Sequence, residues 1–208
     1  MTVIAINGSP RKEGNTSIAL SLMAGELRQQ EIETEIIQVG NQHIAGCRGC
    51  GYCGSSEKNR CVITDDILNE TAMKMRDADG FILASPTYYA GISGTMKCFL
   101  DRLFYANSRY FKYKVGTSIS IARRAGTVDV IHQMNNYLQL AEMVIPPSQY
   151  WPVLYGAKSG EILRDEEGVQ TIRKNAGAMA WLLKVIDASR GSIPLPPEQS
   201  REWTNFIR

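Results

Sequence analysis

The segment TVIAINGSPRKEGNTS, residues 2–17, joins a short apolar run to a polar turn and to the first residues of a helical pattern. An apolar run of this kind is typical of a strand that is buried on both faces of a parallel sheet. Residues Asn7 to Ser9 allow a tight turn, and Arg11 and Lys12 give it positive charge. The segment therefore predicts the first strand, turn and helix of an α/β fold.

The same turn contains the residues of an anion site. Asn15, Thr16 and Ser17 place side-chain donors next to the first amides of the helix, and the helix dipole favours negative charge at that end. These donors suit a monophosphate. The turn is neither a Walker A loop nor a G-x-G-x-x-G fingerprint, because the Gly-Lys-Ser/Thr ending and the three-glycine spacing are absent. An ordinary turn with an asparagine or threonine cap is the alternative.

Further apolar runs alternate with segments of helical spacing. The runs TEIIQV, GFILAS and VGTSISIA occupy residues 34–39, 80–85 and 115–122. Helical spacing recurs at residues 18–27, 67–75, 96–103, 131–143 and 165–189. This alternation predicts an open parallel sheet of about five strands with helices on both faces. The fifth strand falls within MVIPPSQYWPVLYG, residues 143–156, where prolines indicate a broken or edge strand.

The composition of the chain limits the classes of function that it can have. The chain has 208 residues, 44% of them apolar, so we expect one domain over residues 1–208, with a proline-rich tail at about 190–208. The net charge of +2 is spread along the chain, which argues against nucleic-acid and membrane partners. No basic leader precedes the first strand, and no stretch is long enough to span a bilayer. We expect a soluble cytoplasmic protein that acts on small molecules.

A loop at about residues 40–64 lacks periodicity and is longer than most α/β connections. It contains Cys47, Cys50, Cys53 and Cys61, with the spacing C-x2-C-x2-C-x7-C. Thiolates spaced in this way suit an iron-sulfur cubane better than zinc, which prefers two separated pairs. The spacing leaves free or structural thiols open to the same degree, and a disulfide or a zinc site is a further alternative.

Three motifs in order carry a family resemblance: GSPRKEGNTS, then CRGCGYC followed by CVITDD, then SPTYYAGISGTMKCFLDR. Together they resemble the NADPH-dependent FMN reductase family of flavodoxin-like proteins, and especially its iron-sulfur flavoprotein branch. The resemblance covers about the first 125 residues. It implies an α/β, flavodoxin-like, doubly wound five-stranded parallel sheet in the order 2-1-3-4-5, with FMN at the carboxyl ends of the first and third strands.

The resemblance also implies the residues of the cofactor site. The phosphate of FMN would be held by Ser9, Arg11, Asn15, Thr16 and Ser17. The flavin ring would be lined by Pro86, Thr87, Tyr88, Tyr89 and Gly91. The pyrimidine end of the ring would lie beside Arg123, Arg124 and Gly126. In the iron-sulfur branch, the four loop cysteines would hold a [4Fe-4S] cluster.

The implied activity is electron transfer from NAD(P)H through flavin N5 to a small-molecule or protein acceptor. No catalytic side chain is expected, because the cofactor carries the chemistry. The alternative is a flavodoxin-type electron carrier without NAD(P)H turnover, which usually has an acidic surface that this chain lacks. The resemblance also implies a homodimer or homotetramer. Lys97, Asp101 and Arg102 are expected to make helix-surface or subunit contacts, and Cys98 to be a small buried residue.

Overall fold

The computed structural model describes residues 1–55, 59–200, 202, 204 and 206. Residues 56–58 of the predicted cysteine-rich loop lie outside the described part, as do 201, 203, 205, 207 and 208 of the predicted tail.

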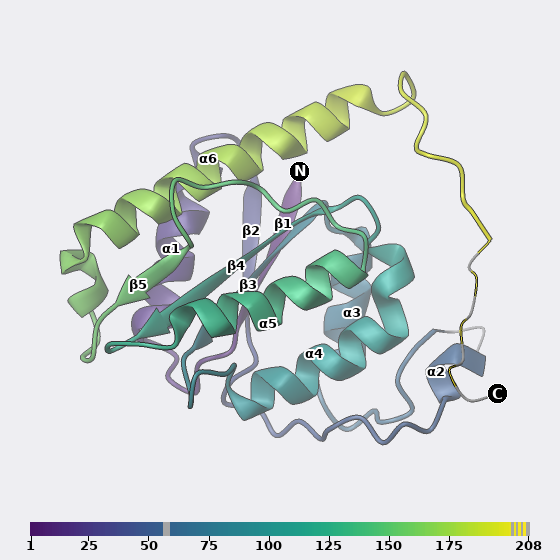
Figure 1. The fold of residues 1–208 in the computed structure, drawn as a ribbon, viewed down its shortest axis with the longest axis horizontal. Coiled ribbons are helices and arrows are strands. Elements are labelled where there is room, and N and C mark those ends of the chain that lie inside the picture. Colours follow the sequence, from purple (N-terminus) through teal and green to yellow (C-terminus); the bar gives the residue numbers. More distant parts are fainter. Residues whose placement is uncertain (56–58, 201, 203, 205, 207–208) are drawn as a thin grey trace.

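Parallel strands form a single sheet within the described residues (Figure 1). The strands are β1 Thr2–Asn7, β2 Glu33–Gln38, β3 Gly80–Pro86, β4 Val115–Ala122 and β5 Val153–Tyr155. They are arranged in the order β2-β1-β3-β4-β5, which confirms the predicted flavodoxin order. Because all pairs are parallel, the loops that follow the strands meet at one edge of the sheet.

Helices cover both faces of the sheet (Figure 1). One face carries α1 Asn15–Arg28 and α6 Glu166–Ser189, and the other carries α3 Leu68–Asp77, α4 Gly94–Asn107 and α5 Thr127–Leu140. The short helix α2, Tyr52–Ser55, lies inside the cysteine-rich loop, and the 3-10 turns η1 and η2 span Ser108–Tyr110 and Glu161–Arg164. Alternate residues of β1 pack on opposite faces: Val3 joins the apolar cluster under α1 and α6, and Ile4 joins the cluster under α3, α4 and α5.

The prediction that each apolar run is buried on both faces is wrong for β2. Its residues are exposed or only partly buried, and Ile36 remains 38% exposed. β2 is an edge strand that pairs only with β1, so helices that centre on the middle of the sheet leave it partly uncovered. β5, for which the prolines indicated a broken or edge strand, is the other edge and has three residues.

Asp79 connects three segments at the amino-terminal edge of the sheet. Its carboxylate accepts hydrogen bonds from the Thr2 amide at 2.9 Å and from Arg190 at 2.6 Å. Burial alone raises the pKa of Asp79, but these two bonds and the charge of Arg190 outweigh burial and hold the pKa below its ordinary value of 3.8. The carboxylate therefore stabilises the folded state wherever it is ionised.

Replacing Asp79 with asparagine is expected to lower the free energy of unfolding by about 1 kcal/mol near pH 7. Because the folded pKa is depressed, this stabilisation is fully present above the ordinary pKa and is lost as the pH falls through the folded value. Urea unfolding of the wild type and of Asp79→Asn should therefore differ near neutrality and converge in acid. The exposed Asp77→Asn is the control, and an equal loss in both variants would contradict the assignment.

Candidate functional site

A cleft of about 210 Å³ lies at the carboxyl-terminal edge of the sheet, where β1, β3 and β4 end. It brings together seven of the residues predicted for the cofactor site, namely Ser9, Arg11, Asn15, Thr16, Pro86, Thr87 and Arg123. The remaining lining residues are Gly14, Ile121, Ala122, Gly156 and Ala157. The turn of the first βα unit and the loops after β3 and β4 thus form one site.

The turn after β1 is fixed by side chains from neighbouring strands. The Asn7 side chain accepts a hydrogen bond from the Ser9 amide at 3.0 Å and donates one to Gln38 at 2.8 Å. Gln38, at the end of β2, in turn donates to the Ser9 carbonyl at 2.5 Å. From the other side, the Ser93 hydroxyl donates to the Gly8 carbonyl at 2.6 Å. The turn is therefore preorganised by Asn7, which the sequence pattern indicated, and by Gln38 and Ser93, which it did not.

The amino terminus of α1 opens into this cleft without a side-chain cap. Its N-cap residue is Gly14, which has no side chain to accept from the first helical amides, and Thr16 is buried beside it. Arg11 and Arg123 line the cleft, and none of the described lining residues is acidic. Free amides, a helix dipole and two guanidinium groups favour a dianionic ligand there.

Asn15 lines the cleft and also anchors a neighbouring loop, while its predicted contact with the phosphate stays a prediction. Its side-chain amide donates to the Lys158 carbonyl at 2.9 Å and accepts from the Gly160 amide at 2.8 Å, and the Ser159 hydroxyl donates to the Glu13 carbonyl at 2.6 Å. Asn15 thus anchors the loop after β5 against the start of α1. This loop closes one side of the cleft, and the glycine-containing run YGAKSG after the fifth strand was the available signal for it.

The two predicted ring-contacting tyrosines lie outside the cleft. Tyr88 and Gly91 pair through two backbone hydrogen bonds of 2.9 Å, and between them Tyr89 and Ala90 adopt positive φ angles of 50° and 56°. Tyr89 is fully exposed. The loop therefore presents Tyr89 to solvent next to the cleft, where an aromatic ring is available to a flat ligand.

Gly126 joins the loops after β3 and β4. Its φ of 87° and the 3.0 Å that would separate a Cβ from the Ala90 Cα leave room only for glycine. Ser17 and Arg124, like Tyr88, Tyr89, Gly91 and Gly126, are absent from the described lining of the cleft. Their predicted contacts with the cofactor stay predictions.

Gly40, the second residue after β2, is a site residue that the sequence did not suggest. Its amide donates to the Asn7 carbonyl at 3.0 Å. A Cβ at this position would lie 2.3 Å from the backbone of Gly8 and Ser9. The close approach of the two backbones holds the phosphate-binding turn in place.

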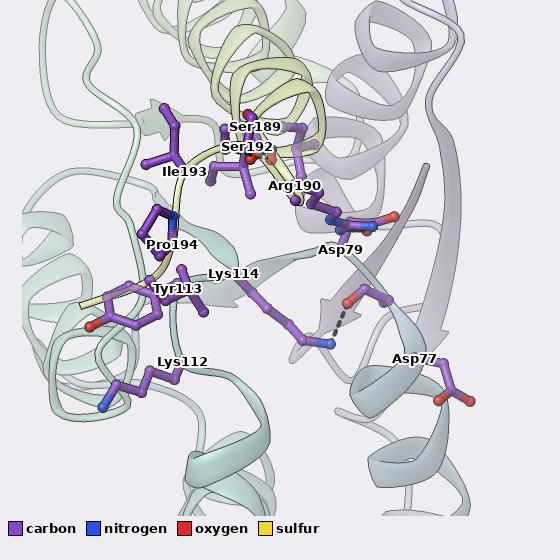
Figure 2. A pocket seen from close by; sticks show the side chains of 15 residues that line it. Asp77, Asp79, Lys112, Tyr113, Lys114, Ser189, Arg190, Ser192, Ile193 and Pro194 are labelled. Atoms are coloured by element: carbon purple, nitrogen blue, oxygen red, sulfur yellow. Dashed lines mark hydrogen bonds and ion pairs between the residues drawn. The ribbon is translucent and has the colours of Figure 1, made fainter. Parts of the chain in front are cut away.

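A larger cavity of about 640 Å³ lies at the opposite edge of the sheet, under the segment that follows α6 (Figure 2). Lys114 points inward and donates to the carbonyl of Ala78 at 2.5 Å and to the carbonyls of Met75 and Arg76 at the end of α3. The other lysine of the cavity, Lys112, pairs with Glu142 and Glu198. Arg190 pairs with Asp79. These cations serve the chain's own oxygens, so the smaller cleft offers the better anion site.

The four loop cysteines line one small pocket of about 20 Å³ beside α4. All four are free thiols; Cys47 and Cys50 are exposed, and Cys53 and Cys61 are partly buried. Burial raises the pKa of Cys53, and the charges of the other three thiols add to the rise. Among the residues that the structure describes, no group of three or more His, Cys, Asp or Glu side chains is placed to hold a metal ion.

The prediction that Arg102 makes surface or subunit contacts is wrong. Its side chain is wholly buried and paired with the equally sheltered Asp66, because the cysteine-rich loop folds over α4 and supplies the partners that a buried guanidinium needs. Lys97 and Asp101 do lie on the surface, as predicted, and form an ion pair of 2.5 Å. Burial, followed by a hydrogen bond to Asp101, raises the pKa of the adjacent Tyr137 to about 12.

A sequence model described as NADPH-dependent FMN reductase matches residues 1–157. The chain belongs to this family. An iron-sulfur flavoprotein of Methanocaldococcus jannaschii is 32% identical over 89% of this chain and 99% of its own length. An iron-sulfur flavoprotein of Methanosarcina thermophila is 28% identical over 91% of this chain and 99% of its own length.

Solved structures resemble this member of the FMN reductase family in fold. RosB, determined with a bound flavin-derived intermediate, superposes with a TM-score of 0.70 at 18% identity over 100% of this chain and 94% of its own. An archaeal flavodoxin superposes with a TM-score of 0.59 at 11% identity over 88% of this chain and 99% of its own. The flavodoxin-like fold, the flavin-oxidoreductase class and the likeness to the iron-sulfur branch are thereby confirmed. In the described ranges, no helix combines the length and apolar character that crossing a bilayer requires.

Proposed function

We propose that this member of the FMN reductase family is an NAD(P)H-dependent oxidoreductase that binds FMN in the cleft and a [4Fe-4S] cluster in the cysteine pocket. The observation that carries the proposal is the cleft itself, in which the uncapped start of α1, Arg11 and Arg123 face one volume without an acidic neighbour among the described lining residues. That arrangement suits the phosphate of FMN.

The cleft fits part of the cofactor. At about 210 Å³ it is smaller than the ~300–1,000 Å³ usual for a whole ligand, so it holds the phosphate end, with the ring left to the loops after β3 and β4. FMN supplies hydride acceptance and one-electron or two-electron release when bound. The chain's own contribution is orientation: Gln38 and Ser93 fix the phosphate turn, and Gly126 holds the two ring-side loops together.

The cysteine pocket fits a cubane by its donor set. Each thiolate of a [4Fe-4S] cluster binds a different iron, so the four sulfurs must surround a common volume rather than converge on one point. Cys47, Cys50, Cys53 and Cys61 line one pocket and supply this donor set, but the pocket of about 20 Å³ must open to hold the cluster. The turns between them contain Gly49 and Gly51, both with positive φ and with no neighbour within 4 Å of an added Cβ, so the loop has room to adjust around a cluster.

The test is anaerobic purification followed by FMN, iron and acid-labile sulfide analysis, and then mixing with NADPH or NADH while the flavin absorbance is followed. We expect about one FMN and about four irons per chain, and bleaching of the flavin by at least one nucleotide. Absence of FMN overturns the proposal. FMN without iron overturns its cluster part, and flavin that neither nucleotide bleaches favours the electron-carrier alternative.

We also propose that the protein is a cytoplasmic homodimer or homotetramer and that its electron acceptor is a small molecule or a protein. Five free cysteines support a reducing compartment. A groove of about 770 Å³ between α4 and α5 supports assembly, since Tyr105 and Leu140 are 66% and 79% exposed along it, next to Cys47. Light scattering on the purified protein measures the assembly directly.

A further inference from the structure

Arg102 is the one charged side chain lining the cysteine pocket whose exposed fraction is zero in the described part of the chain. It lies on α4, and its Nε donates a hydrogen bond to the sulfur of Cys61 at 3.2 Å. The opposite edge of the guanidinium pairs with Asp66, which is 4% exposed. Arg102 therefore places a desolvated positive charge directly against one of the four thiols.

The same guanidinium connects both arms of the cysteine-rich loop. It donates to the Ala45 carbonyl at 3.2 Å, before the first three cysteines, and to the Ile63 carbonyl at 3.1 Å, after the fourth. Asn69 reinforces the second arm, because its side chain bonds both the amide and the carbonyl of Cys61 at 3.0 Å. Cys61 is thus held in position from two sides, while Cys47 and Cys50 remain exposed.

A hydrogen bond to a ligating sulfur and a nearby positive charge both stabilise the more negative, reduced form of an iron-sulfur centre. Burial strengthens both effects, because the surrounding dielectric is low. Asp66 works in the opposite direction, but it lies on the far side of the guanidinium from the sulfur. Arg48, the other cation at the pocket, is exposed and screened.

We propose that Arg102 is the positioning residue of the cysteine pocket: it fixes Cys61 as the fourth ligand and sets the reduction potential of the cluster above the value the cysteines alone would give. The proposal rests on the cluster assigned under the proposed function. It predicts an effect on the reduction potential of the cluster and none on that of FMN. The reason is that Arg102 lines the cysteine pocket and is absent from the described lining of the flavin cleft.

The test compares Asp66→Asn with the double variant Arg102→Gln and Asp66→Asn, in FMN-loaded protein purified without oxygen. The pair differs only in the guanidinium, and it avoids leaving a buried carboxylate without a partner. Anaerobic spectroelectrochemistry gives the cluster and FMN midpoints separately. We expect the midpoint potential of the cluster in the double variant to be lower by at least ~59 mV, which is a tenfold change in the equilibrium constant for one electron. The midpoint potential of FMN should be unchanged.

Loss of iron with retention of FMN in the double variant also supports the proposal, because it shows that the fourth ligand is no longer held. Equal iron and equal cluster potentials in the pair overturn it, as does an equal shift in the control Lys97→Gln, which removes an exposed cation from the same helix. If the double variant loses FMN as well, Arg102→Lys takes its place. One ammonium keeps the charge but cannot reach Cys61, Ala45 and Ile63 together, so an unchanged iron content together with an unchanged cluster potential in that variant overturns the proposal.

Wild-type protein that contains FMN but no iron overturns the cluster assignment itself, and the role of Arg102 with it, before any variant is made. Wild-type protein with iron and an unaffected double variant overturns only the role of Arg102. The two failures are therefore distinguishable in the same set of preparations.

Discussion

Replacing Cys50 with serine is expected to reduce iron from about four atoms per chain to near zero, while FMN remains bound. Cys50 is exposed and lines the cysteine pocket, so the change removes a thiolate without opening the packed core. A serine hydroxyl stays protonated at neutral pH and is a poor substitute for a thiolate. Iron and acid-labile sulfide analysis, together with the flavin absorbance of the same sample, measures both parts of this result.

Cys98→Ser is the matched control. Cys98 is the fifth cysteine, and it lies on α4 outside the described lining of the pocket, where it packs against the apolar core. We expect this variant to retain its full iron. Iron that persists in Cys50→Ser, or that is lost equally from Cys98→Ser, would contradict the assignment of the four loop cysteines as ligands.

The fold was predictable because its signals are local. Apolar runs such as GFILAS become buried parallel strands, and the spacing of apolar residues between them becomes the buried face of each helix. The exposure of β2 was not predictable, because an apolar run of the same length suits both a buried strand and an edge strand. The prolines did indicate an edge position for β5, but its bounds were not predictable, because three residues next to prolines carry almost no periodicity.

The phosphate turn was predictable for a similar reason, since its residues are consecutive. The residues that support it were not. Gln38 and Ser93 reach the turn from β2 and from the start of α4, and such long-range hydrogen bonds leave no pattern in the sequence. Arg102 looked like a surface residue because its partner Asp66 lies 36 positions away. The pairing of Arg102 with Asp66 becomes apparent only in the folded chain.

Gly40→Ala tests whether the close packing of Gly40 against the turn after β1 is needed for FMN binding. A Cβ at position 40 would meet the carbonyl oxygen of Gly8 and the carbonyl group of Ser9 at 2.3 Å, and these are backbone atoms that no side-chain rotation can move aside. The turn must shift, and the amides at the start of α1 then no longer converge with Arg11 on one anion. We expect FMN to bind at least ~100-fold more weakly, about 2.7 kcal/mol of binding free energy, measured by flavin fluorescence titration.

Gly25→Ala separates this steric effect from a general response to replacing glycine. Gly25 lies within α1, and an added Cβ there would find no atom within 4 Å. Alanine in a helix is favoured over glycine by about 0.5–1 kcal/mol, so this variant should unfold at a higher temperature with its FMN affinity unchanged. If Gly40→Ala bound FMN as tightly as Gly25→Ala, the turn after β1 could not be the phosphate site. The alanine at position 40 would then have displaced the turn without changing the affinity for FMN.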